Sequence, residues 1–493
     1  MTLVNRILPT RPLPDLDAYL ADGGGRGLDA ARQVEPAALI DEVAASGLRG
    51  RGGAGFPTGT KWRTVAAHRA PDPDVPTTVV VNAAEGEPGT FKDRTLLRAD
   101  PYAVLEGALV AAIAVGGSDV VVALKGGEPV ERQRVARAVE EMREAKMLGD
   151  VAVSLVAGPD EYLFGEETAL LEVVAGRAPL PRIAPPYRRG VVELVGDEAD
   201  VASGSGLAAP VEMAGPGPAT VAPPALVDNV ETLANVPRIV ADGAAWFREL
   251  GTEASPGTIV CTVTGDVRHP GVGEVPMGTT VRAAIDAIAG GPSARRPIKA
   301  VLNGVSAAPL APSSLDTPLT YEDMAAVGSG LGTASLIVVG EGTDMTAVAA
   351  GAARFLAVES CGQCTPCKAD GLAIADALDR LCAGGGDAHD LDAVTRALTT
   401  VADGARCNLA RQQQDVVGGI VTAWDDEVVR RATGAVEAVT PVLVAEVTAL
   451  EDGEVTLDEH RHTKQPDWSH DAEWSGSYPA DLLGDHRQPD ELA

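Results

Sequence analysis

The sequence ESCGQCTPCK at residues 359–368 decides much of the fold, because three cysteines at such short intervals are rarely placed for packing. They are Cys361, Cys364 and Cys367, and a fourth cysteine, Cys407, follows in a separate segment. Three thiolates from one compact run and one from a distant loop give the four sulfur ligands of a [4Fe–4S] cluster. Zinc is the alternative, but structural zinc sites usually combine two separated Cys-x2-Cys pairs. The spacing therefore favours the cluster.

The two remaining cysteines indicate neither a second metal site nor a disulfide framework. Cys261 and Cys382 lie in apolar segments and are expected to be buried core thiols. Six cysteines in 493 residues, without a signal peptide, do not describe a small secreted scaffold.

The composition bounds the class of protein. A hydrophobic content of 45% in 493 residues is enough for packed cores in about three domains. Aromatic residues make up only 3%, while glycine and proline are plentiful, which favours a loop-rich α/β protein. The net charge of −30 argues against binding to nucleic acid or to an anionic membrane, and favours contact with other protein surfaces.

No segment predicts secretion or a membrane span. Residues 1–6 lack the apolar core of a signal peptide. Residues 104–124 are strongly apolar, but Glu106 and the GGSD turn at residues 116–119 divide them into a helix, a turn and a buried strand. We therefore expect a cytoplasmic protein with no direct membrane insertion.

A glycine-rich loop, GLRGRGGAGFPTGTKW at residues 47–62, follows an expected helix at residues 36–46. The preceding helix argues against a Rossmann dinucleotide fingerprint, and the loop does not match a Walker A motif. Glycines let backbone N–H groups approach a phosphate closely, and Arg51 and Lys61 add positive charge. A flexible linker is the alternative, but linkers seldom contain phenylalanine, tryptophan, arginine and lysine together. The composition favours a ligand-binding loop.

Two further polar segments follow predicted strands. The turn NAAEGEPGTFKDR at residues 82–94 comes directly after a buried strand at residues 77–81, where ligands of open α/β sheets gather. The helix at residues 165–172 opens on paired glutamates, which in a purely structural reading answer the helix dipole.

The rest of the chain divides into smaller parts. Residues 188–225 predict an insertion or mobile loop, and a β/α module with a hairpin begins near residue 257. From residue 343 to about 433 the pattern is helical. The segment from about residue 450 is charged and predicts a solvated, partly disordered tail. Its histidines are spaced too irregularly to favour a metal site: His460, His462, His470 and His486.

Taken in order, five of these segments resemble the motifs of the NADH-binding 51 kDa flavoprotein subunit of respiratory complex I, a type that recurs in NAD-reducing hydrogenases and NAD-dependent formate dehydrogenases. The segments are residues 47–62, 82–94, 165–171, 227–233 and 359–367 with Cys407. The resemblance covers roughly residues 30–430.

The resemblance implies an α/β fold in three parts followed by a tail. Residues 1–250 would form a Rossmann-like domain for FMN and NADH, with 188–225 as its insertion loop. Residues 256–340 would form a ubiquitin-like β-grasp (SLBB) domain, residues 341–440 a helical bundle with the [4Fe–4S] site, and residues 450–493 an acidic tail.

By position, the resemblance also assigns ligand-binding residues. Those that would line FMN are Gly50, Arg51, Gly52, Lys61, Asn82, Glu85, Gly165, Glu166, Val227, Asn229 and Thr232. Those that would face NADH are Phe56, Glu87 and Glu167. No side chain is expected to act as a catalytic acid or base, because the flavin itself takes the hydride.

The sequence departs from the family pattern around the same pocket. Ala84 and Gly86 replace Asp and Ser, and Thr64 replaces an aromatic residue. Tyr187 replaces Phe, and Ala184 stands where a Lys is common. The loss of stacking and of charge would each weaken NADH binding by about 1 kcal/mol or more.

The function implied is electron input: NADH is oxidised by way of FMN, and single electrons pass through the cluster to partner subunits. The expected partners are a thioredoxin-like iron–sulfur subunit of the 24 kDa type and a larger redox complex, through which the protein would be held at the inner face of a membrane. Two alternatives stay open. One is the same module in a formate dehydrogenase or hydrogenase complex with another donor or acceptor, and the other is a non-catalytic assembly subunit.

Overall fold

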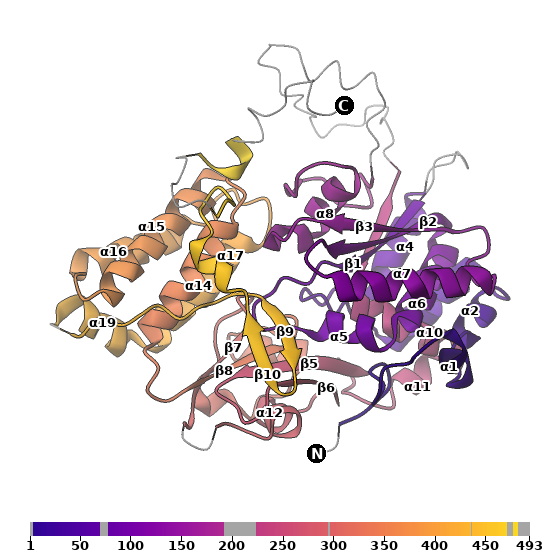
Figure 1. Ribbon diagram of the computed structural model, residues 1–493, viewed down its shortest axis with the longest axis horizontal. Coiled ribbons are helices and arrows are strands. Elements are labelled where there is room, and N and C mark those ends of the chain that lie inside the picture. Colours follow the sequence, from indigo (N-terminus) through magenta and orange to yellow (C-terminus); the bar gives the residue numbers. More distant parts are fainter. Residues whose placement is uncertain are drawn as a thin grey trace, which may run out of the picture.

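The computed structural model describes residues 3–69, 77–191, 223–293, 296–434, 436–470 and 477–481. Figure 1 shows an α/β part on the right, a second sheet at the bottom and a helical bundle on the left. Most of the predicted insertion at residues 188–225 lies outside the described residues, as does His486.

The first sheet is parallel throughout, with the strand order β3-β2-β1-β4. Its strands are β1 (Thr77–Ala83), β2 (Gly117–Lys125), β3 (Ala152–Gly158) and β4 (Ala225–Asn229). A parallel strand that is buried on both faces needs apolar residues in succession, which explains the Val79-Val80-Val81 run. The strands predicted at residues 77–81 and after the turn at residues 116–119 are confirmed.

Helices cover both faces of this sheet. Val79 and Val81 pack toward α6 (Pro101–Val115), whereas Val80 packs with Phe164 and α8 (Glu167–Val174). Alternate residues of a strand point to opposite faces, so one β-branched run serves two cores. Further helices of this part are α1 (Leu16–Ala21), α2 (Arg26–Ala31), α3 (Pro36–Ser46), α4 (Thr58–Ala67), α5 (Lys92–Ala99), α7 (Pro129–Glu144), α10 (Val230–Asp242) and α11 (Ala244–Phe247).

The second sheet is mixed, with the order β6-β5-β8-β7. It contains the predicted hairpin β5 (Thr258–Gly265) and β6 (Gly271–Pro276), and the pair β7 (Ile298–Asn303) and β8 (Ser335–Gly340). The parallel pairing of β5 with β8 at its centre gives the expected β-grasp arrangement. The helices α12 (Val281–Ala289) and α13 (Tyr321–Ala326) belong to this part.

The bundle is built on α14 (Met345–Glu359) and α15 (Thr365–Cys382). Cys361 and Cys364 lie between these helices, and Cys367 lies in the first turn of α15. The remaining helical elements are α16 (Ala388–Thr400), α17 (Leu409–Gln412), the π-helical turn η3 (Gln413–Val417), α18 (Gly418–Ala423) and α19 (Asp425–Thr433). None of the described helices is long and apolar enough to cross a membrane.

The structure differs from the expected tail after residue 450. β9 (Val447–Glu451) and β10 (Glu454–Leu457) form an antiparallel hairpin, and the 3-10 turn η4 (Glu459–Thr463) follows it. Arg461 and Lys464 are almost fully buried, because acidic groups from distant parts of the chain neutralise them. Local composition gives no sign of such partners, which is why this segment reads as a solvated tail.

Candidate functional site

A cavity of about 850 Å³ lies at the carboxyl ends of β1 and β4, where all three parts of the molecule contribute to its wall. Ligands of open parallel sheets gather at this edge. The expected site residues that line the cavity are Gly50, Gly52, Phe56, Lys61, Asn82, Glu85, Glu87, Gly165, Glu166, Glu167, Val227, Asn229 and Thr232. The structure thus brings together segments that lie far apart in the sequence, such as the glycine-rich loop and the start of α10.

The glycine-rich loop forms a tight hairpin and not a flexible linker. Gly50 N–H donates to the Phe56 carbonyl (2.8 Å), and Gly53 and Gly55 adopt positive φ angles of 122° and 64°. A Cβ on Gly52 would lie 3.2 Å from the Asn229 Cβ, and one on Gly165 would lie 2.8 Å from the Ala84 carbonyl oxygen. A side chain at Gly165 would clash with the backbone and one at Gly52 would crowd Asn229, so both positions present their backbone to the cavity.

Lys61 supplies positive charge to the cavity wall. Its ammonium donates to the Val227 carbonyl (2.6 Å) and pairs with Glu167, and Asp228 Oδ1 lies 3.8 Å away. Burial opposes a charge here, but Glu167 and Asp228 raise the pKa of Lys61. Burial also raises the pKa of Asp228 to about 6, although Lys61 counteracts it. The ammonium therefore stays protonated at neutral pH.

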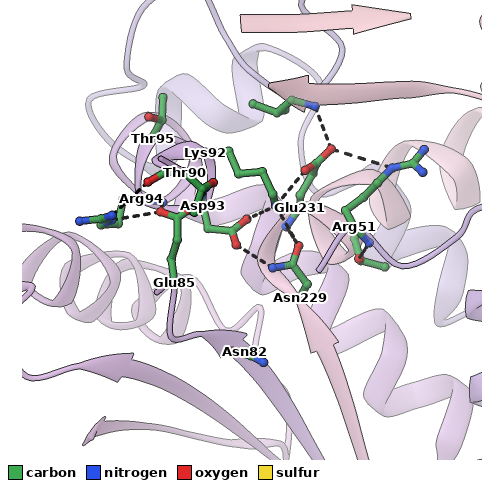
Figure 2. A network of polar contacts seen from close by, with 12 residues as sticks. Arg51, Asn82, Glu85, Thr90, Lys92, Asp93, Arg94, Thr95, Asn229 and Glu231 are labelled. Carbon is green, nitrogen blue, oxygen red and sulfur yellow. Dashed lines mark hydrogen bonds and ion pairs between the residues drawn. The ribbon is translucent and has the colours of Figure 1, made fainter. Parts of the chain in front are cut away.

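Arg51 is the exception among the expected FMN residues, because its side chain does not line the cavity. Its guanidinium donates to the Tyr321 hydroxyl (3.0 Å) and to the Thr258 carbonyl (3.0 Å), and it lies 3.9 Å from Glu231. Figure 2 shows the Arg51 side chain beside Glu231, to which a dashed line joins it. The guanidinium thus joins the glycine-rich loop to the β-grasp part, and only the backbone of residue 51 stays near the ligand edge.

The network around Lys92 holds the polar turn after β1 in place. The Lys92 ammonium lies 2.7 Å from Asp93 and 2.9 Å from Glu231, and Asn229 Nδ2 donates to Asp93 (2.7 Å; Figure 2). Burial, together with the neighbouring Glu85 and Glu231 and despite Lys92, raises the pKa of Asp93 to about 6. Asn229 also caps α10 by accepting from the Glu231 N–H.

The glutamates of the site have different environments. Burial would raise the pKa of Glu85, but Arg94 and Lys92 lower it. Burial raises the pKa of Glu87 to about 7, although it accepts hydrogen bonds from the Tyr162 hydroxyl (2.6 Å) and from Val305 N–H (2.7 Å). Glu166 caps α8 through the N–H groups of Thr168 and Ala169, so the structural reading of the paired glutamates holds for this residue.

Two polar side chains act mainly on the backbone. Asn82 Nδ2 donates to the Gly165 carbonyl (2.8 Å), and Thr232 Oγ1 accepts from Arg51 N–H (2.8 Å). They align the turns that carry the cavity-lining glycines.

The four expected cluster ligands, Cys361, Cys364, Cys367 and Cys407, line one small cavity beside the first. The Ser360 hydroxyl lies 3.2 Å from the Cys367 sulfur, and Gln363 Nε2 donates to the Cys361 sulfur (3.5 Å). Among the described residues, no group of three or more His, Cys, Asp or Glu side chains is gathered around a single-ion position. Each cysteine of a cubane binds a different iron atom, so its sulfurs stand farther apart than around one ion. Cys261 and Cys382 are buried elsewhere, as expected.

Leu163, Cys407 and Leu409 line both cavities. The ligand cavity and the cysteine site are therefore separated by a single layer of side chains. This layer joins the loop before α8 to the start of α17 in the bundle.

The residues fit both expected groups. A glycine cradle with a lysine suits a flavin phosphate, and four cysteines with no competing ligand suit an iron–sulfur cluster. Of the departures, Ala84 and Gly86 line the cavity, whereas Thr64, Ala184 and Tyr187 do not. A Cβ on Gly86 would lie 2.7 Å from Lys125 Nζ, so a buried lysine occupies the space of a larger residue there.

Sequence reasoning missed several cavity residues. Tyr162 and Gln412 share a hydrogen bond (2.8 Å) across 250 positions of sequence, and Tyr321 and Thr333 come from the β-grasp part. Tyr162 stands just before the recognised Gly165 motif, which is the one signal that pointed to it.

Three family models match the chain in succession. A Nuo51 FMN-binding domain matches residues 43–238, an SLBB domain matches residues 260–305, and an NADH-ubiquinone oxidoreductase-F iron-sulfur binding region matches residues 347–431. These matches support FMN over a structural role for the glycine-rich loop, and the cluster over zinc.

Curated relatives extend the similarity. An F-type subunit of the NADH-quinone oxidoreductase of Rhizobium meliloti is 37% identical over 388 residues, which is 76% of this chain and 85% of the relative. The corresponding F-type subunit of Streptomyces coelicolor is 38% identical over 387 residues, 76% of this chain and 79% of the relative. The HndC subunit of the NADP-reducing hydrogenase of Solidesulfovibrio fructosivorans is 34% identical over 423 residues, 84% of this chain and 79% of the relative.

A solved structure agrees with the sequence matches. A chain of an NAD+-reducing [NiFe]-hydrogenase in the H2-reduced state superposes with a TM-score of 0.72 at 30% identity, over 86% of this chain and 67% of that chain. With the FMN-binding, SLBB and iron–sulfur regions in this order, the chain belongs to the family of 51 kDa-type, NADH-binding flavoprotein subunits that includes the F-type subunits of NADH-quinone oxidoreductase.

Proposed function

We propose that this chain oxidises NADH in the large cavity by way of FMN and passes electrons singly through the [4Fe–4S] cluster to partner subunits. The observation that carries the proposal is the shared wall of Leu163, Cys407 and Leu409 between the cavity and the cysteine site. When bound, FMN accepts a hydride as an electron pair and releases electrons one at a time, which suits a cluster that carries single electrons.

The protein's own residues would bind and orient the flavin and the dinucleotide. The backbone of the glycine-rich loop and the Lys61 ammonium would hold the flavin phosphate, since a dianion in a glycine nest gains from a fixed cation. Phe56 is about half exposed and lines the cavity, which suits a ring that receives a planar ligand from solution.

Glu87 and Glu167 would position the dinucleotide. The Tyr162 hydroxyl and Val305 N–H fix both oxygens of Glu87, so its carboxyl group stands in one orientation. Glu167 lies at the cavity wall against Lys61. Neither residue needs to transfer a proton for the hydride to move.

An anaerobic titration of the purified protein with NADH tests the proposal. We expect NADH to bleach the flavin absorption band and then to produce the EPR signal of a reduced cluster. A flavin that stays oxidised with NADH but is reduced by dithionite would reject NADH as the donor. A protein with neither the flavin band nor the iron–sulfur shoulder would be an assembly subunit.

A second candidate is the same module in a hydrogenase- or formate dehydrogenase-type complex. It is favoured by the similarity to the HndC subunit and to the hydrogenase chain, which covers 84% and 86% of this chain respectively. Mass spectrometry of the complex isolated from its own cells separates the two, because only the second candidate predicts co-purified hydrogenase or formate dehydrogenase subunits.

The relatives are subunits of larger redox complexes, and we propose the same for this chain. Its direct partner would be a thioredoxin-like iron–sulfur subunit that accepts electrons from the cluster. The complex would lie in the cytoplasm, held at the inner face of a membrane through partner subunits.

A further inference from the structure

The chain continues past residue 431, where the last family match ends, into a segment that lies across two parts of the molecule. We name residues 441–470 and 477–481 the C-terminal strap. In Figure 1 its hairpin of β9 and β10 lies between the helical bundle and the α/β part. The strap is therefore placed to connect them.

A series of buried, ion-paired side chains, which we call the charge chain, runs through the strap. Lys125 Nζ and Arg461 Nη2 both donate to Glu446 Oε1, at 2.7 and 2.9 Å. Arg461 Nη1 and Lys464 Nζ both donate to Glu359 Oε1, the latter at 2.9 Å. Each of the five side chains belongs to a residue that is no more than 9% exposed. Signs alternate along the chain, so each carboxylate is compensated from two sides.

Two members of this series of charges, Lys125 and Glu359, lie at the two functional sites. Lys125 ends β2, and its ammonium stands beside Gly86 of the ligand cavity. Glu359 ends α14, two positions before the first cluster cysteine, and its other oxygen accepts from Tyr162 N–H (2.9 Å). Arg461 bridges the two carboxylates, so the strap couples the cavity side to the cluster side.

The strap also covers the cysteine loop directly. Ala480 N–H donates to the Cys361 carbonyl (3.1 Å), and a Cβ on Gly362 would lie 2.6 Å from the Tyr478 Cβ. The Pro466 carbonyl accepts from Lys368 Nζ (3.0 Å), which is fully buried next to Cys367. Contacts this close leave no solvent layer between the strap and these loop positions.

Buried ion pairs contribute little net stability but are costly to break singly, so they specify one packed arrangement. We propose that the C-terminal strap is a retaining clamp for the iron–sulfur cluster: it closes the cysteine loop and locks the bundle against the α/β part, and iron leaves the cluster when the strap opens. The inference rests on the [4Fe–4S] site of the proposed function, but not on NADH as the donor.

The test uses the full protein with FMN and cluster loaded, and measures iron release to a ferrous-iron chelator under anaerobic conditions. Arg461→Gln removes the bridging charge, and a chain ended after His470 removes the cover over Cys361 while keeping the charge chain. We expect each to release iron about tenfold faster, which corresponds to ~1.4 kcal/mol in the free energy of opening. Arg461→Lys keeps the charge and should fall between the parent and Arg461→Gln.

Arg282→Gln is the matched control, because it removes an exposed arginine from a 2.9 Å pair with Asp316 in the β-grasp part. It should release iron at the parental rate. If the chain ended after His470 releases iron at the parental rate, the clamp proposal is wrong. This outcome does not depend on whether Arg461→Gln accumulates as folded protein. Flavin bleaching by NADH, measured on the same samples, reports on the proposed function separately.

Discussion

At the scale of single residues, replacing Lys61 measures how much its positive charge, as distinct from the backbone N–H groups of the glycine-rich loop, contributes to binding the FMN phosphate. Lys61→Ala should weaken FMN binding by about tenfold or more, because it removes a cation and leaves Asp228 and Glu167 uncompensated near a phosphate. Flavin and iron content per chain are the measurements, and iron should stay at the parental level. Arg63→Ala, an exposed neighbour on α4, is the control. Full flavin occupancy in Lys61→Ala would place the phosphate elsewhere.

Arg51 shows how far residue-level reasoning reaches. The glycine-rich composition predicts a ligand loop, and the loop lines the large cavity, because glycines act through backbone geometry that is local. The direction of a long side chain is not local. Arg51 turns away from the cavity since Tyr321, Thr258 and Glu231 offer it three partners, all at least 180 positions away in sequence.

At the scale of elements, the cap of α6 combines with burial to give a pH dependence. Asp100 accepts from Ala103 N–H (3.1 Å) and is buried, which raises its pKa to about 7 despite that hydrogen bond. Between about pH 4 and 7 the folded protein keeps a proton that the unfolded chain has lost, so the free energy of unfolding falls as the pH rises through this range and the loss stays constant above about pH 7.

Asp100→Asn keeps a capping side chain but has no charge to bury. We expect it to raise the free energy of unfolding by about 1–2 kcal/mol more at pH 8.5 than at pH 5.5. Denaturant unfolding of the two proteins at both pH values measures this difference. Other buried acids titrate in both proteins and cancel. An equal gain at the two pH values would show that the Asp100 carboxyl is not the titrating group.

The second prediction at this scale concerns the cysteines that would bind the cluster. Serine at Cys361, Cys364, Cys367 or Cys407 should abolish the EPR signal of the reduced cluster, because each thiolate holds one iron atom. Serine at Cys261 or Cys382 should leave the signal intact, since Cys261 is packed in the β-grasp core, Cys382 lies at the opposite end of α15 from Cys367, and neither lines the cysteine cavity. Loss of the signal in Cys382→Ser would contradict this ligand set.

Helices and strands were predictable from the sequence where a single local pattern was enough to specify them. The valine run of β1, the stop of α3 at Gly47 and the helices around the cysteine run all follow from local signals. The strap was not predictable, because its burial depends on distant partners. Glu359 lies more than 100 positions from Arg461, and Lys125 lies more than 300 positions from Glu446. Long-range charge compensation has no signature in composition.

At the scale of the whole molecule, Glu231 joins the α/β part to the β-grasp part. It is fully buried, lies 2.9 Å from Lys92 and 3.9 Å from Arg51, and accepts from Val260 N–H (2.9 Å). Glu231→Gln leaves two cations without their shared anion, so we expect a loss of about 3 kcal/mol in the free energy of unfolding.

Glu249→Gln is the matched control, because it removes an exposed carboxylate from a 3.0 Å pair with Arg6 and should cost less than about 1 kcal/mol. Chemical unfolding followed by circular dichroism measures both variants. Equal stability of the two variants would mean that the contact between the parts does not depend on this carboxylate.

The strap also has a consequence for the order of biosynthesis. All four cluster cysteines lie before residue 408, whereas the strap begins at residue 441, so the ribosome delivers the ligands before their cover. A nascent or newly released chain therefore passes through a stage in which the loop is complete but still open. Iron–sulfur assembly factors would act in that interval, and folding of the strap would then end it.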